Sequence, residues 1–309
     1  MENPSRRLFH LPRKVSDKSE RCITFRVETS EHSSELGAWQ TAQRSADPRL
    51  RAFVHGFFAT SSLLPAPLSE RHVPALEVPL FFNFGEVHRY TDGTRDGVWV
   101  VGLHDRHRLT EAVGERRFMV VRFTPMGAHL FLGLPMHTIV NEAVDLHAID
   151  PALARQLWSR VGVARSWADR FAAMESLIAE RIGGAESPVG IAWKKLLASD
   201  GRIALTSLAS DMQCSYRTFI ARFRSSIGLP PKTIARLMRF NRVVRSIDRR
   251  GSDSVGKPYI ESTGESVPIP WADVAADCGY FDQAHLIREF REFAGSTPGA
   301  FMRQVSSIK

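Results

Sequence analysis

Residues 273–298 have the sequence DVAADCGYFDQAHLIREFREFAGSTP, and much of this pattern occurs a second time earlier in the chain. The offset between the copies is 66 residues at first (209 to 275) and 67 afterwards (215 to 282), so the later copy has one extra turn residue. The matching positions include Ala209, Ser215, Phe219, Phe223, Gly228 and Pro231 in the first copy and Ala275, Asp282, Leu286, Phe290, Gly295 and Pro298 in the second. A repeated pattern indicates a repeated structural unit.

Each copy predicts a helix-turn-helix. Ser215 and Asp282 are residue types that cap a helix N-terminus, because their side-chain oxygens accept hydrogen bonds from the free amides there. Two apolar residues four positions apart follow, as on the buried face of an amphipathic helix, and a glycine and a proline end it. A single copy could equally be an ordinary helical hairpin. The two matched copies favour two reading heads on one DNA duplex.

The distribution of charge supports DNA binding. The chain has a net charge of +8, and residues 190–309 hold 18 basic and 11 acidic residues, so nearly all of the excess lies there. Between 217 and 250, Asp248 is the one acidic residue among ten basic ones. A basic block attached to a doubled helix-turn-helix is typical of a surface that contacts phosphates.

Composition sets the wider frame. A chain of 309 residues with 43% apolar and 24% charged residues is typical of a globular protein of about two domains. No apolar run approaches the roughly 20 residues that a membrane helix needs. The sequence Met-Glu-Asn-Pro at residues 1–4 does not resemble a secretory signal, and the three cysteines lack metal-ligand spacing. We therefore expect a cytoplasmic, nucleoid-associated protein with reduced thiols.

The two copies and the segment between them resemble the DNA-binding domain of the AraC/XylS family of bacterial transcription regulators. The resemblance covers residues 191–309 and is closest over 273–298. It implies about seven helices, with a linker helix near 232–248 between two helix-turn-helix units that enter successive major-groove segments. It also implies promoter DNA as the partner, a homodimer, and RNA polymerase as a further contact. An activator is the expected role, and the sequence leaves a repressor as the alternative.

Helix geometry and the resemblance together predict the side chains that meet DNA. Arg and Gln suit guanine and adenine through paired hydrogen bonds, and apolar groups suit the thymine methyl. Arg222 is rotated toward the flank of the first recognition helix, a position that favours contact with a DNA phosphate. The predicted set is Ser215, Tyr216, Arg217, Ile220, Arg222, Arg224, Arg239, Arg242, Asp282, Gln283, His285 and Arg288.

The chain departs from the family pattern at two places. The second copy has Arg288 two residues before the buried Phe290, whereas the first has Ala221 at the matching position. The first recognition helix is therefore expected to read DNA through Arg217 and apolar contacts. Residues 251–270, rich in Gly, Ser and Pro, form a long connection between the units.

The N-terminal part predicts a different kind of domain. Residues 1–48 are expected to be a mostly irregular basic and polar arm. Residues 49–184 are expected to form a cupin-like sensor or dimerisation domain, and 185–190 a linker. Apolar, β-branched runs at 76–84, 97–103 and 118–123 predict strands of a small barrel or sandwich. Residues 151–182 predict a helix whose stripe at Trp167, Phe171, Met174 and Ile178 either dimerises or packs on its own barrel. The predicted fold class is α+β: this barrel with flanking helices, followed by an all-α domain.

Two other functions compete with a ligand-sensing regulator. One is a metal-dependent cupin enzyme fused to a DNA-targeting module. It would draw ligands from His72, Glu77, His88, His104, Asp105, His107 and Glu111, but the chain has no His-x-His pair. The other is an N-terminal domain that only dimerises. The sequence predicts no catalytic residue, metal or cofactor, and ligand-binding residues cannot be assigned from it.

Overall fold

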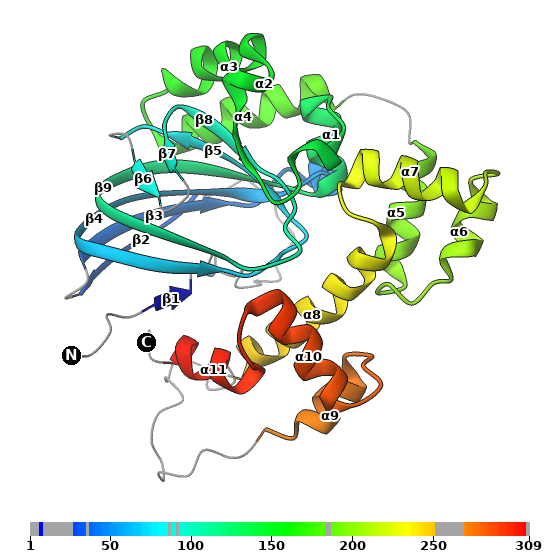
Figure 1. Ribbon diagram of the computed structural model, residues 1–309. Coiled ribbons are helices and arrows are strands. Elements are labelled where there is room, and N and C mark those ends of the chain that lie inside the picture. The colour runs from blue at the N-terminus through cyan, green and yellow to red at the C-terminus, as the bar shows by residue number, and fades with distance from the viewer. Residues whose placement is uncertain are drawn as a thin grey trace, which may run out of the picture.

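A computed structural model describes residues 6–8, 27–34, 37–85, 88–90, 93–182, 187–250 and 269–306. The N-terminal part is a curved, mostly antiparallel sheet with helices on one side, and the C-terminal part is helical (Figure 1). This is the α+β layout that the sequence predicted. No helix in these ranges has the length and apolar character needed to cross a membrane.

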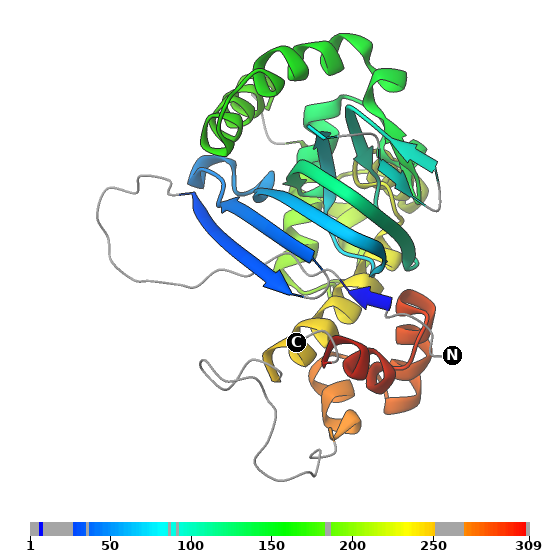
Figure 2. The same cartoon turned by 90° about the vertical axis from the view of Figure 1, so that its left-hand side faces the viewer.

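The sheet is built around two long antiparallel strands, β4 (Val54–His72) and β9 (Arg108–Phe123). The main strand order is β10-β8-β5-β9-β4-β3-β2, and β1 adds to β4 in parallel. The other strands are β1 (Arg6–Leu8), β2 (Glu28–Ser34), β3 (Gly37–Arg44), β5 (Val78–Asn83), β8 (Val98–Val101) and β10 (Ala143–Asp145), with a separate hairpin of β6 (His88–Tyr90) and β7 (Gly93–Arg95). Among these strands β10 and β2 are the two ends of the order, so the predicted barrel is a curved sheet open between them (Figure 2).

The prediction of an irregular arm over 1–48 is wrong for residues 28–44. Strands β2 and β3 form a hairpin there, with Ser30 opposite Thr41 and Glu31 opposite Gln40. Cross-strand side chains join it, since the hydroxyls of Ser30 and Thr41 lie 2.6 Å apart and Gln40 Nε2 donates to Glu31 Oε1 at 2.9 Å. The sequence did not reveal this hairpin because polar, mostly exposed strands lack the apolar alternation that marks a buried one.

The alternation of side chains gives the sheet two different faces. On one face Phe57, Leu80 and Val121 are buried in the main hydrophobic core, and Phe57 packs against Phe171 of the helical layer at 5.6 Å between ring centroids. On the opposite face Phe58, Phe118 and Val120 form a separate small cluster, with Phe81 packed against it.

The helical layer comprises α1 (Pro125–Leu132), α2 (Leu146–Ile149), α3 (Pro151–Leu157) and α4 (Trp167–Arg181). The predicted single helix over 151–182 is interrupted. A π-helical segment, Trp158–Gly162, follows α3, and α4 begins only after Ser166, whose side chain caps the amide of Asp169 at 3.1 Å. Phe171, Met174 and Ile178 are fully buried in the core of the same chain. The stripe therefore packs on its own domain.

Seven helices follow in the described part of the C-terminal region, the number that the family resemblance implied. They are α5 (Pro188–Ala198), α6 (Leu205–Asp211), α7 (Tyr216–Ile227), α8 (Pro231–Arg250), α9 (Trp271–Asp277), α10 (Gln283–Ala294) and α11 (Pro298–Ser306). Helix α5 begins at Pro188, and the Ser187 side chain caps it by accepting from the amide of Gly190. The last residues of the predicted linker 185–190 are therefore helical. Most of the predicted 251–270 connection lies outside the described residues.

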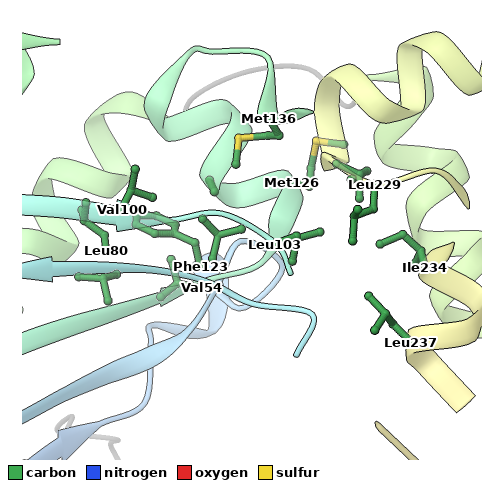
Figure 3. Close-up of a cluster of buried hydrophobic side chains, with 14 of the residues drawn as sticks. Val54, Leu80, Val100, Leu103, Phe123, Met126, Met136, Leu229, Ile234 and Leu237 are labelled. Carbon is green, nitrogen blue, oxygen red and sulfur yellow. The ribbon is translucent and has the colours of Figure 1, made fainter. Parts of the chain in front are cut away.

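The two parts of the chain share one hydrophobic core. Figure 3 shows Leu229, two residues before α8, and Ile234, in the first turn of α8, on the side that faces Met126 of α1 and Met136 of a 3₁₀ helix spanning Met136–Ile139. All four side chains are buried. The first helix-turn-helix is therefore packed directly on the N-terminal domain.

Candidate DNA-binding surface and internal cavity

The two helix-turn-helix units match in length as well as in sequence. Helices α6 and α9 have 7 residues each, and α7 and α10 have 12 residues each. The first helices are offset by 66 residues and the second by 67, so the extra turn residue predicted in the later copy is present. Helix α8 connects the two units (Figure 1).

Ser215 and Asp282 cap the recognition helices α7 and α10. Ser215 Oγ accepts from the amide of Thr218 at 3.1 Å, and Asp282 Oδ1 accepts from the amide of His285 at 2.6 Å. Both side chains are exposed. Their observed role is to satisfy the free amides at the helix start, which fixes where each recognition helix begins.

The outer faces of α7 and α10 carry most of the predicted contact residues. On α7 the Phe219 and Phe223 rings are fully buried, which turns the opposite side outward. On α10 Leu286 and Phe290 have the same function. The exposed residues on these two faces are Tyr216, Arg217, Arg222, Arg224, Gln283 and Arg288, while Ile220 is half-buried.

Two further residues on this surface were not predicted from the sequence. Phe281, just before the Asp282 cap, is 93% exposed, and Arg291 is exposed one turn after Ile287. Periodicity could have indicated Arg291, because it lies three residues after Arg288 on the same side of the helix. No pattern distinguishes Phe281 from a buried aromatic residue, since its exposure depends on how the turn is packed.

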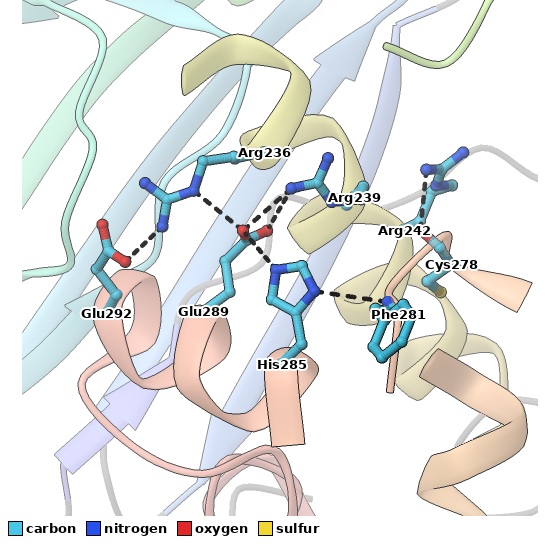
Figure 4. A network of polar contacts seen from close by, with 8 residues as sticks. All are labelled: Arg236, Arg239, Arg242, Cys278, Phe281, His285, Glu289 and Glu292. Atoms are coloured by element: carbon cyan, nitrogen blue, oxygen red, sulfur yellow. Dashed lines mark hydrogen bonds and ion pairs between the residues drawn. The ribbon is translucent and has the colours of Figure 1, made fainter. Parts of the chain in front are cut away.

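An ion-pair network joins α8 to α10 (Figure 4). Its centre is Glu289, which is only 4% exposed. Arg236 Nε donates to Glu289 at 3.0 Å, and Arg239 Nη2 donates to the same carboxylate at 3.1 Å. Arg236 also pairs with Glu292, and His285 Nε2 lies 3.7 Å from Glu289. A buried carboxylate needs such partners, because leaving it without cations would be strongly destabilising.

Arg239, Arg242 and His285 thus have partners within the protein. Arg242 donates to the carbonyl of Cys278 at 2.9 Å and lies 3.3 Å from Asp200, and its side chain is 15% exposed. Arg239 joins α8 to α10 and Arg242 joins α8 to the end of α9, whereas His285 lies against Glu289 on its own helix. Their predicted contacts with DNA stay predictions. The sequence could not reveal the pairing because the partners of these arginines lie 36 to 50 residues away.

Both recognition helices end against the N-terminal domain. At the end of α7, Gly228 is so close to Val140 that an added Cβ would lie 3.3 Å from Val140 Cγ2. At the end of α10, Arg71 Nη1 from β4 donates to the carbonyl of Ala294 at 3.0 Å. The next residue, Gly295, lies against the ring of His107. The opposite, N-terminal ends of these helices are the ends that contact bases in helix-turn-helix proteins.

A cavity of about 240 Å³ lies on the sheet face opposite α4. Aromatic and aliphatic side chains from β4, β5, β8 and β9 form much of its wall, joined by polar groups at one side. The lining residues that matter here are Phe58, Glu70, Phe81, Trp99, His104, Arg116, Phe118 and Val120. No sequence pattern indicated this cavity, because β4 was not predicted as a strand.

The main charges at this wall are already paired. Arg116 Nη1 donates to Glu70 Oε1 at 2.8 Å, and both side chains are almost fully buried. Arg122 forms two hydrogen bonds with Glu77, at 2.7 and 3.0 Å. The Arg116 guanidinium also lies over the Phe118 ring at 5.1 Å. These two pairs account for the carboxylates of Glu70 and Glu77, and the lining also includes Arg108.

His104 is a neutral histidine in this wall. Its burial lowers its pKa from 6.5 to about 4, and the nearby Arg108 adds to the shift. Nδ1 lies 2.7 Å from the carbonyl of Gly102, which can only accept, so Nδ1 carries the proton. Nε2 is then an acceptor, and it is buried with no hydrogen-bond partner among the described residues.

The candidate metal ligands have separate partners. His72 Nε2 lies 2.8 Å from Thr110 Oγ1, and Asp105 accepts from Asn141 at 3.0 Å. His104 lines the cavity, whereas His107 lies against Gly295. Among the described side chains, no three His, Cys, Asp or Glu residues come together as a group that could hold a metal ion.

Comparison with known families identifies the C-terminal region. Residues 208–304 match a helix-turn-helix domain, which is of the AraC type. Residues 43–145 match a family described as a domain of unknown function (DUF6597). The chain matches none of the curated proteins. Residues 208–304 thus form a helix-turn-helix domain of the AraC type.

Solved structures to which the chain is similar include several regulators. The DNA-binding domain of AdpA in complex with a target DNA is 23% identical, covers 40% of this chain and 96% of its own, and has a TM-score of 0.30. ToxT from Vibrio cholerae strain SCE256 bound to an unsaturated fatty acid is 9% identical, covers 94% and 99%, and has a TM-score of 0.41. The AraC-like activator CuxR is 8% identical, covers 71% and 86%, and has a TM-score of 0.27. The assignment of residues 208–304 as a helix-turn-helix domain rests on the domain match and on the geometry of the two units.

Proposed function

We propose that this transcription regulator reads promoter DNA with α7 and α10 and that a small molecule in the sheet cavity changes how these two helices are presented. The single observation that supports this best is the repeated arrangement of the two units. Each recognition helix has an exposed N-terminal face for DNA, while its C-terminal end lies on the N-terminal domain.

The coupling between cavity and DNA is proposed to run through strand β4. Glu70 lines the cavity, and the next residue, Arg71, donates to the carbonyl of Ala294 at the end of α10. Consecutive strand residues point to opposite faces, so a ligand that shifts Glu70 also shifts the donor that holds α10. A ligand can move this equilibrium only by as much as it prefers one arrangement over the other.

Homodimerisation and contact with RNA polymerase remain predictions from the family resemblance. The α4 stripe packs inward, so a dimer contact through this layer would use other side chains. Trp158 and Val163, at 41% and 72% exposure, are apolar residues on the outer side of the helical layer. An N-terminal domain that only dimerised would leave the partly aromatic cavity without a role.

Selection of duplexes from a randomised pool, followed by binding across a salt series, tests the DNA-binding role. We expect tight binding to the selected sequence and much weaker, steeply salt-dependent binding to its scrambled version. The Arg288→Ala variant should lose affinity for the selected sequence only. Arg155→Ala, which removes an exposed arginine on α3, is the matched control and should bind normally. Equal binding to both duplexes by the wild-type chain would contradict sequence-specific reading.

A further inference from the structure

The shape of the cavity wall indicates a flat ligand. The rings of Phe81 and Trp99, which face each other across β5 and β8, are parallel within 1° and 5.0 Å apart. Phe118 lies beside this pair, with its ring tilted by 56°. Aromatic rings prefer offset stacking, so a further flat ring would extend the pair favourably. The volume of about 240 Å³ is below the range typical of drug-sized ligands and suits one or two fused rings.

The charges of the wall disfavour a cationic ligand. The buried carboxylate of Glu70 already pairs with Arg116, and Glu77 already pairs with Arg122. A cation would have to be desolvated in this largely apolar space without a carboxylate set aside for it, which is costly. A neutral molecule avoids that cost.

His104 adds a requirement for a hydrogen-bond donor. The Gly102 carbonyl fixes the proton on Nδ1, so Nε2 offers a lone pair in the wall of the cavity. This atom is buried without a partner among the described residues, and buried acceptors are nearly always satisfied in folded proteins. An O–H or N–H group on a bound molecule would satisfy it.

We propose that the cavity binds a compact aromatic molecule that carries an O–H or N–H donor, of the phenol or indole type, with that donor bound to His104 Nε2. This inference rests on the proposed effector role of the cavity and names the chemical class of the effector.

Two matched pairs of probes test the proposal on the unmodified full-length chain. Phenol and indole each have a close analogue without the donor, namely anisole and 1-methylindole. Isothermal titration calorimetry should show phenol or indole binding roughly tenfold or more tighter than its analogue, because the analogue leaves Nε2 unpaired. The comparison is made between ligands, so it does not depend on any variant folding correctly.

Three variants test whether the probes bind in the cavity and whether His104 accepts their hydrogen bond. His104→Phe should reduce the preference for the donor-bearing probe to about twofold or less, while both aromatic probes still enter. His137→Phe changes an exposed histidine outside the cavity and should leave the preference intact. Ala143→Phe fills the cavity from a half-buried lining position and should abolish binding of all four probes.

The possible failures are distinguishable. Equal affinity for phenol and anisole, and for indole and 1-methylindole, would overturn the donor requirement. A preference that persists in His104→Phe would overturn the assigned acceptor. If none of the four probes binds but decanoate does, and binding is lost in Ala143→Phe, the aromatic class is wrong while the effector cavity stands. If the probes bind as expected but leave operator affinity unchanged, the ligand class stands and the regulatory role fails.

Discussion

The two helix-turn-helix units have the same local structure but are attached to the protein by different kinds of interaction. The first ends in an apolar contact, where Gly228 lies against Met136 and Val140 and Leu229 lies beside Met126 (Figure 3). The second ends in a polar contact, where Arg71 binds the carbonyl of Ala294 and Gly295 lies against the His107 ring. The ion pairs of Glu289 add further polar attachment to α8.

This difference indicates that the position of the first helix-turn-helix unit is fixed, whereas the position of the second is adjustable. Burial of apolar surface is insensitive to pH and only weakly sensitive to salt, so the first unit should keep its position under most conditions. The hydrogen bonds and ion pairs that hold the second unit respond to protonation and to small displacements. We therefore expect signals from the N-terminal domain to reach DNA mainly through α10.

The largest expected effect tests whether the two units have equivalent cores. Phe223→Ala and Phe290→Ala each remove a fully buried ring, and each should lower the free energy of unfolding by about 3–5 kcal/mol. Urea denaturation of the full chain measures both. A loss below about 1 kcal/mol for either one would show that its unit is not packed as described.

The next effect separates the reading chemistry of the two helices. Arg288→Ala should reduce affinity for the selected duplex by roughly tenfold to a hundredfold, about 1–3 kcal/mol, and should relax preference at one or two base pairs. Arg217→Ala should do the same at a different position of the site. Fluorescence anisotropy with single-base variants of the duplex measures this.

Arg222→Ala is the control for a phosphate contact. It should weaken binding to all sequences about equally and reduce the salt slope by about one. If the losses caused by Arg217→Ala and Arg288→Ala fell on the same base pairs, the two helices would not be separate reading heads.

A smaller effect tests the contact at the end of α10. Gly295 has a φ of +69°, and an added Cβ would lie 2.3 Å from the Cε1 atom of His107. Gly133 has a φ of +70° with nothing within 4 Å, so Gly133→Ala reports the backbone cost alone, about 1 kcal/mol.

Gly295→Ala should therefore cost more than Gly133→Ala, by about 1 kcal/mol, because the His107 ring must move. The excess should disappear in a His107→Ala background, as a double-mutant cycle in thermal denaturation would show. An excess that survives the removal of His107 would mean that the ring does not hold α10.

The smallest effect is the pH dependence of the same contact. Burial lowers the pKa of His107 below its usual 6.5, and the charge of Arg71 lowers it further. A histidine with a lowered folded pKa stabilises the folded arrangement above pH 6.5, and this contribution is lost as the pH falls toward the lowered value. Hydrogen exchange of α10 amides should therefore speed up by a few-fold from pH 8 to pH 5.5, after correction for the intrinsic rate, while α7 amides stay unchanged. Equal changes in both helices would remove the proposed difference between the units.

The repeat made the DNA-binding half largely predictable. Capping residues, the stripes at Phe219/Phe223 and Leu286/Phe290, and the closing glycines are local signals, so the helices and their outward faces could be located from sequence. The roles of Arg239, Arg242 and His285 could not, because pairing with Glu289, Cys278 and Asp200 depends on how α8 packs across α9 and α10. The polar hairpin β2–β3 was missed because its exposed strands lack the apolar alternation of a buried strand. The cavity was missed because it depends on contacts over long sequence distances, such as that of Glu70 with Arg116, which no local pattern records.

Hydroxyl-radical footprinting of the selected duplex tests the central claim of two reading heads most directly. The wild-type chain should protect two short segments on one face of the DNA, with centres about 10 base pairs apart. Arg217→Ala should weaken protection of one segment and Arg288→Ala that of the other. A single protected segment, or two segments that both fade in either variant, would contradict the account.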